Sequence, residues 1–156
     1  MPSTRFVTDS SLAFLARRLR MLGYDVVVLP GARLEEVLEA ARRDGRVALT
    51  LSARHPRAFA DVSRRRVERD RTAEAVRAIA EADPPSGPPF GRCSECNTAL
   101  QTRHPMEARG EVPGAVLRSA RTLTFCPGCG KWYWEGSHVA RLRAWFEEAL
   151  GHPPPN

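Results

Sequence analysis

The chain has 156 residues, of which 42% are apolar and 27% are charged. This composition excludes a largely disordered chain, because the aliphatic side chains suffice to offset the entropy lost on folding, and the length suits one domain or a core domain with a small appendage. The formal net charge of +6 favours polyanionic partners, with nucleic acid first among them.

Strand and helix signals alternate through the first 82 residues. Short aliphatic or β-branched runs predict strands, whereas apolar residues at three- and four-residue spacing predict helices. Strands are expected at 5–8, 25–29, 47–51 and 66–67, and helices at 12–22, 33–43 and 72–82, with a shorter helix near Phe59 and Val62. This βαβα order predicts an α/β fold whose open parallel sheet is flanked by helices and joined by right-handed crossovers.

A change in composition marks a domain boundary at residues 83–91. Proline or glycine occupies six of these nine positions, and neither residue sustains a helix or a strand. We therefore expect an α/β domain at 1–82, a linker at 83–91, a small second domain at 92–150 and a flexible tail at 151–156. Within the second domain, strands are expected at 122–125 and 131–134, before a final helix that begins at Ser137.

No apolar run approaches the roughly 18–20 residues that cross a bilayer, and the first residues lack the apolar core of a signal peptide. We accordingly expect a cytoplasmic protein with no membrane partner.

Four cysteines form two close pairs, separated by 29 residues. Each C-x2-C pair can form a knuckle, and two knuckles supply the four ligands of a tetrahedral Zn²⁺ site. The predicted zinc ligands are Cys93, Cys96, Cys126 and Cys129. The long intervening stretch suggests a hairpin insertion, and the alternative for the cysteines is a pair of disulfide or redox sites.

Two longer motifs carry a resemblance to a known family. They are FVTDSSLAFLARRLRMLGYD at 6–25 and CPGCGKWYWEGSH at 126–138. Both resemble the Mut7-C family, over about residues 5–150. The resemblance implies a PIN-like nuclease domain followed by a zinc ribbon and a C-terminal helix, in a family proposed to be ribonucleases.

The resemblance also implies catalytic carboxylates, which would hold Mg²⁺ or Mn²⁺ at the carboxyl ends of parallel strands. Asp9, Glu36 and Asp70 fall at the matching positions, and Glu35 is an alternative to Glu36. Each residue has a simpler interpretation. Asp9 is also a good N-cap, Glu35 and Glu36 are also ordinary acids of a first helical turn, and Asp70 also precedes a helix cap.

One position departs from the family pattern. Similar proteins read Thr-Arg-Asp after the third strand, whereas this chain reads Thr50-Leu51-Ser52. Replacing a carboxylate with a hydroxyl weakens the affinity of a site for a divalent cation. The substitution puts catalysis in doubt but not the fold.

Arginines supply 23 of the 24 basic residues. The candidates for RNA-backbone contacts are Arg17, Arg20, Arg65 and Arg69, although a run of charge is more often a solvated face. Three aromatic residues at 132–134 can stack on bases or form part of a ribbon core.

Three functions follow from these features. The first is a metal-dependent ribonuclease that hydrolyses phosphodiester bonds of RNA. The second is a catalytically inactive module that binds RNA or a ribonucleoprotein, and Ser52 is the feature that separates the two. The third is a protein-interaction adaptor, since zinc ribbons often present a flat surface to partners.

Overall fold

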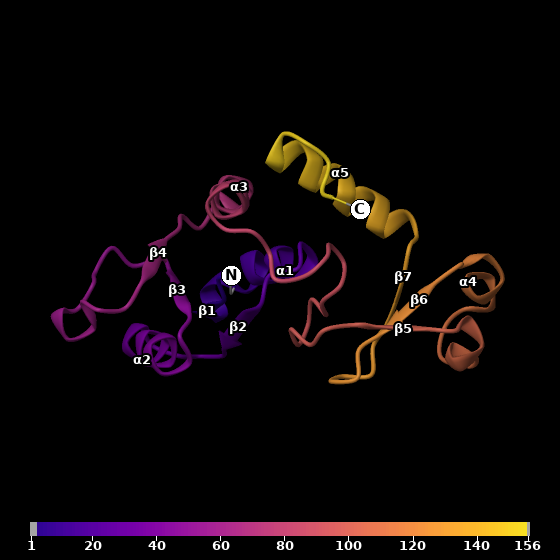
Figure 1. The fold of residues 1–156 in the computed structure, drawn as a ribbon, viewed down its shortest axis with the longest axis horizontal. Coiled ribbons are helices and arrows are strands. Elements are labelled where there is room, and N and C mark those ends of the chain that lie inside the picture. The colour runs from indigo at the N-terminus through magenta and orange to yellow at the C-terminus, as the bar shows by residue number, and fades with distance from the viewer. Residues whose placement is uncertain (1–2, 156) are drawn as a thin grey trace.

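A computed structural model describes residues 3–155 and contains two sheets (Figure 1). The first is a parallel sheet of four strands in the order β2-β1-β3-β4, as the alternating pattern predicted. Its strands are β1 (Phe6–Asp9), β2 (Val26–Leu29), β3 (Val47–Thr50) and β4 (Arg64–Arg66). Three helices follow these strands, namely α1 (Ala13–Met21), α2 (Leu34–Asp44) and α3 (Thr72–Ala82). The predicted α/β class is therefore confirmed.

Helices cover both faces of this sheet. Successive side chains of a strand point to opposite faces, so Phe6 packs toward α1 and α3 while Val7 packs toward α2. The α2 face is closed by Val37, Leu38 and other small apolar residues. All three helices begin at the edge where the parallel strands end, and this edge is called the carboxyl edge below.

Two local predictions in this half differ from the structure. The fourth strand begins at Arg64, two residues before its predicted start, because its pairing with β3 uses backbone groups of the arginine run. The predicted short helix after Pro56 is a single 3-10 turn, Arg57–Phe59.

The second sheet lies in residues 92–134, which we call the cysteine module. Its antiparallel strands are β5 (Gln101–Arg103), β6 (Leu123–Phe125) and β7 (Trp132–Trp134). The stretch between the cysteine pairs, where a hairpin was expected, contains the antiparallel strands β5 and β6, but a long helical segment joins them. It contains the 3-10 turn Pro105–Ala108 and helix α4 (Gly114–Ser119), and prolines at the start of both favour helical turns over strands.

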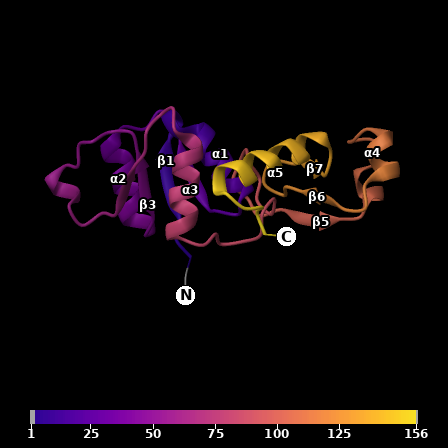
Figure 2. The same cartoon turned by 90° about the horizontal axis from the view of Figure 1, so that it is seen from above.

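The C-terminal helix α5 (Ser137–Leu150) runs from the cysteine module back to the first domain (Figure 2). It packs against α3, and its buried residues Leu142, Phe146 and Leu150 join the core that contains Phe6. Residues 83–91 are likewise held against the end of α1: a Cβ atom on Gly23 would lie 2.2 Å from the carbonyl oxygen of Gly87. The domain limits that the composition suggested stay a prediction.

Among residues 3–155, no helix combines the length and the apolar character that crossing a bilayer requires.

The packing of α5 predicts that Phe146→Ala destabilises the whole α/β domain. Phe146 is fully buried and packs edge-on against Phe90, with ring centroids 6.3 Å apart. Removing the ring should lower the free energy of unfolding by about 3–5 kcal/mol. Urea denaturation measures this loss, and the exposed Arg141→Ala on the same helix should change it by less than about 0.5 kcal/mol. An equally small loss for Phe146→Ala would show that α5 is not part of the core.

Candidate functional site

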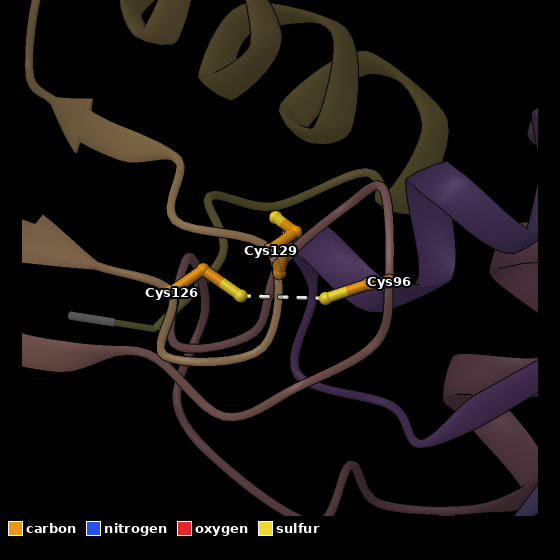
Figure 3. Close-up of side chains that lie close together, drawn as sticks. Cys96, Cys126 and Cys129 are labelled. Atoms are coloured by element: carbon orange, nitrogen blue, oxygen red, sulfur yellow. Dashed lines mark hydrogen bonds between the residues drawn. The ribbon is translucent and has the colours of Figure 1, made fainter.

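The sulfurs of the two cysteine pairs converge in the cysteine module. Their Sγ atoms all lie within 4.8 Å of one another, and Cys93 lies 3.7 Å from Cys129. Figure 3 shows three of the four, with Cys96 3.3 Å from Cys126. A disulfide needs about 2.05 Å between sulfurs, and all four thiols are free. Four sulfurs about 2.3 Å from a tetrahedral Zn²⁺ would lie about 3.8 Å apart. The arrangement therefore fits zinc and not two disulfides.

The two knuckles have the same type of backbone turn. The amide of Asn97 donates to the carbonyl of Cys93 (3.0 Å), and the amide of Gly130 donates in the same way to the carbonyl of Cys126 (2.8 Å). Asn97 and Gly130 both have positive φ, 72° and 77°. Asparagine and glycine are the residues that most readily adopt this conformation, so the local sequence suits the turn at both places.

Gly128 allows the two knuckles to approach each other. A Cβ atom at this position would lie 2.4 Å from Oγ1 of Thr98 and 3.2 Å from Sγ of Cys96. A larger residue here would push the first knuckle away from the second and open the four-sulfur group.

The crowding of four sulfurs separates their pKa values. The hydrogen bond with Thr98 lowers the pKa of Cys96 to about 6. Burial raises the pKa of Cys126. The amide of Lys131 lowers the pKa of Cys129, but burial and the three neighbouring sulfurs outweigh it and raise this pKa to about 12. Four thiolates cannot share this space without a cation, which is the electrostatic condition that a bound metal ion satisfies.

Tyr133 extends the group toward β7. Its hydroxyl lies 3.0 Å from Sγ of Cys93 and 3.4 Å from Oγ of Ser94. Burial raises the pKa of Tyr133, so the phenol keeps its proton and can donate a hydrogen bond to the Cys93 sulfur.

The first knuckle is bonded directly to the edge strand β2. Asn97 accepts from the amide of Val26 (3.0 Å) and donates to Asp25 (2.7 Å). Arg20 donates to the carbonyls of Val26 and Ser94, both at 2.9 Å. The side chains of Asn97 and Arg20 thus bond to the amide and the carbonyl of Val26, on the edge strand of the sheet.

Arg20 lies at the junction between the cysteine module and the parallel sheet. Only 6% of this residue is exposed, and its guanidinium donates to backbone carbonyls of β2 and of the first knuckle. These hydrogen bonds join the cysteine module to the sheet, and contact of Arg20 with RNA stays a prediction.

Asp25 completes this junction. Burial alone would raise the pKa of Asp25, but hydrogen bonds from Arg46 (2.8 Å) and Asn97 hold it below its ordinary value. The carboxylate therefore stays ionised and links β2, the first knuckle and the loop before β3.

The candidate catalytic acids lie at the carboxyl edge of the sheet. Asp9 ends the central strand β1, and its Oδ1 accepts from the amide (2.7 Å) and the hydroxyl (2.5 Å) of Ser11. It thereby caps the 3-10 turn Ser10–Leu12, which was the simpler interpretation of this residue. Asp70 is exposed on the turn between β4 and α3.

Glu35 and Glu36 begin helix α2, as expected, and each is paired with an arginine. Glu35 lies 2.6 Å from Nη2 of Arg54, and Glu36 lies 3.2 Å from Nε of Arg33. Within residues 3–155, the four cysteines are the one group of three or more potential ligands that converge to within 4.8 Å. The catalytic assignment of Asp9, Glu36 and Asp70 stays a prediction.

Ser52 occupies the loop that follows β3. Its Oγ accepts from the amide of Arg54 (3.1 Å), and the guanidinium of Arg64 donates to the carbonyls of Ser52 and Ala53. Where an aspartate was expected, the loop is held by neutral and cationic groups.

The remaining predicted RNA-binding arginines differ in their surroundings. Arg17 is exposed on α1 and Arg69 on the turn before α3, and neither forms an ion pair within the described residues. Arg65 is half-buried and pairs with Asp83.

The sequence prediction missed the residues that support the four cysteines. Asn97 carried a usable signal, because it follows the first cysteine pair as Gly130 follows the second. Thr98 and Tyr133 carried none, since their contacts with sulfur arise only when distant knuckles meet.

A comparison with protein families finds that the Mut7-C RNAse domain matches residues 4–146. No curated protein and no solved structure gives a match.

The cysteine group predicts one zinc ion per chain, with an affinity that falls as the pH falls. Cys126 and Cys129 keep their protons near neutral pH in the metal-free protein, so binding releases at least two protons and the affinity should rise by at least about a hundredfold per pH unit. Mass spectrometry of the native protein gives the stoichiometry, and competition with a chelator at pH 6.5 and 7.5 gives the affinity. Cys129→Ser should lose the ion. A metal-free native protein, or a pH-independent affinity, would contradict this assignment.

Proposed function

The chain belongs to the Mut7-C RNAse domain family, and on that premise we propose that it is a metal-dependent ribonuclease that hydrolyses phosphodiester bonds of RNA. The observation that carries this proposal is the family match over residues 4–146, which spans both sheets. The parallel sheet supports it, because a carboxylate at the end of the central strand stands where crevices open in sheets of this type.

In this proposal Asp9 is the principal carboxylate, with Glu36 and Asp70 contributing from the neighbouring turns. Carboxylate oxygens are the donor type that Mg²⁺ and Mn²⁺ prefer. Such a cation, when bound, would polarise the scissile phosphate and lower the pKa of a water molecule. Glu36 can bind the cation only after its ion pair with Arg33 breaks. Asp9 can bind it through Oδ2 while Oδ1 still caps the turn.

Zn²⁺ has a structural role in the proposal. Four cysteine ligands leave no open coordination position, so the ion would supply folding free energy to a module with strands of only three residues. Free thiols of this kind persist in a reducing compartment, which is the basis for proposing a cytoplasmic location.

A second function is favoured by the carboxyl edge itself. Ser52 stands in place of an aspartate, and Arg33 and Arg54 neutralise Glu36 and Glu35. An edge with these ion pairs attracts divalent cations weakly. The second candidate is therefore an inactive module that binds RNA, or a ribonucleoprotein, through its arginines.

The ribonuclease proposal predicts that Asp9→Asn abolishes Mn²⁺-dependent cleavage of RNA. The loss should be at least about a hundredfold, because a bound cation supplies several kcal/mol of transition-state stabilisation. The assay follows a pool of labelled RNAs on a gel. The matched control is Asp44→Asn, at the far end of α2 from the carboxyl edge, which should keep full activity. EDTA should stop the reaction and Mn²⁺ restore it, with zinc content measured in the same samples.

Two outcomes would favour the second candidate. One is salt-sensitive RNA binding without cleavage by the natural protein. The other is cleavage that appears only in Ser52→Asp, which would show that the fold can catalyse the reaction but that this edge lacks a carboxylate.

A further inference from the structure

A cavity of about 740 Å³ opens where helix α1, the cysteine module and helix α5 meet. Its walls come from the outer face of α1, from β6 and β7, and from the first turns of α5. Figure 2 shows α5 running from β7 back toward α3 beside this region. We call this cavity the interdomain cleft. It is separate from the carboxyl edge, and Arg17 is the one residue lining it that the sequence proposed as a catalytic, RNA-binding or metal-binding residue.

Aromatic side chains give the interdomain cleft its apolar surface. Phe14 is 53% exposed, and Phe14 and Met106 are the two large apolar residues that are exposed within residues 3–155. The guanidinium of Arg18 lies between two rings, 4.8 Å from the centroid of Phe14 and 4.6 Å from that of Trp145. This packing holds Phe14 at the wall of the cleft while more than half of the residue stays exposed. Such a ring is a platform on which a nucleic-acid base can stack.

Charge in the interdomain cleft is predominantly positive. Five cationic residues and two acidic residues line it, and the two acids are already paired, Glu95 with Lys131 (3.9 Å) and Glu135 with Arg143 (2.9 Å). The other three cations, Arg17, Arg18 and Arg92, form no ion pair with a carboxylate of the described residues. The Nε of Arg18 is buried without a hydrogen-bond partner among these residues. Unpaired guanidinium groups beside an exposed ring match a ligand that carries both phosphates and bases.

The orientation of α1 connects the interdomain cleft to the carboxyl edge. Phe14, Arg17, Arg18 and Met21 recur at helical spacing, so they form one stripe along the helix. Asp9 precedes α1 by the single turn Ser10–Leu12. The Phe14 end of the stripe is therefore the end that lies toward the candidate catalytic residue, and the Met21 end lies away from it.

We propose that the interdomain cleft binds a single-stranded segment of RNA, with a base stacked on Phe14 and phosphates bound by Arg17 and Arg92. The inference rests on the proposed function and adds to it a substrate path along α1. The volume matches that of small-ligand sites, so the cleft takes a few unpaired nucleotides and excludes a duplex. Stacking makes the contact tolerant of sequence, and the arginines make it dependent on salt.

The test measures binding of a fluorescein-labelled twelve-nucleotide oligouridine by fluorescence anisotropy. It uses the zinc-loaded full chain without added Mn²⁺, so that no cleavage interferes. Phe14→Ala and Arg17→Ala should each weaken binding about tenfold. Their matched controls are the exposed Met106→Ala and the exposed Arg43→Ala at the end of α2 on the other face of the sheet, and both should bind within about twofold of the natural protein.

The outcomes separate this inference from the ribonuclease proposal. Unchanged binding in Phe14→Ala and Arg17→Ala would overturn the cleft site, whether or not the protein cleaves RNA. Weakened binding in both, with no cleavage by the natural protein in Mn²⁺, would support the cleft and reject the nuclease. Equal affinity for a twelve-base-pair duplex, or displacement of the RNA by an equal concentration of polyglutamate, would also overturn it, because an acidic polypeptide would then satisfy the cleft as well as RNA does.

Discussion

Convergence of four cysteine sulfurs is the constraint on which the arrangement of this protein depends. The second sheet has strands of three residues and a core of a few apolar side chains, Ala108, Val112 and Leu123 among them. A unit of this size buries little apolar surface, so a metal ion held by the four sulfurs would supply folding free energy that its core does not. Asn97 of the first knuckle bonds to both Val26 and Asp25 of the parallel sheet's edge.

The four-cysteine group is therefore connected to the α/β domain as well as to its own module. Arg20 and Asn97 fasten the first knuckle to the edge of the parallel sheet, and α5 closes the other side by burying Phe146 in the same core as α1 and α3. The interdomain cleft lies between these two attachments. Its shape follows from both attachments, so the four-cysteine group helps to shape the cleft that we propose as an RNA site.

Much of this arrangement could be predicted from local sequence, and the rest depends on contacts between distant residues. The strands and helices of the first domain follow from periodicity, and the cysteine group follows from C-x2-C spacing, because coordination geometry restricts how two pairs can meet. Arg20 resembles its neighbours Arg17 and Arg18 in sequence, and only the position of the knuckle makes it structural. The return of α5 to the first domain was likewise set by packing that no local pattern encodes, whereas the prolines that start the helical insertion were a local signal.

Native-state hydrogen exchange at the amide of Val26 tests most directly whether the cysteine metal group holds the two halves together. This amide donates to Asn97 of the first knuckle, whereas the amide of Ala48, which donates to Ser63 inside the sheet, provides an internal reference. Removal of zinc should reduce the protection of Val26 far more than that of Ala48. Equal protection of Val26 with and without the metal would contradict the account.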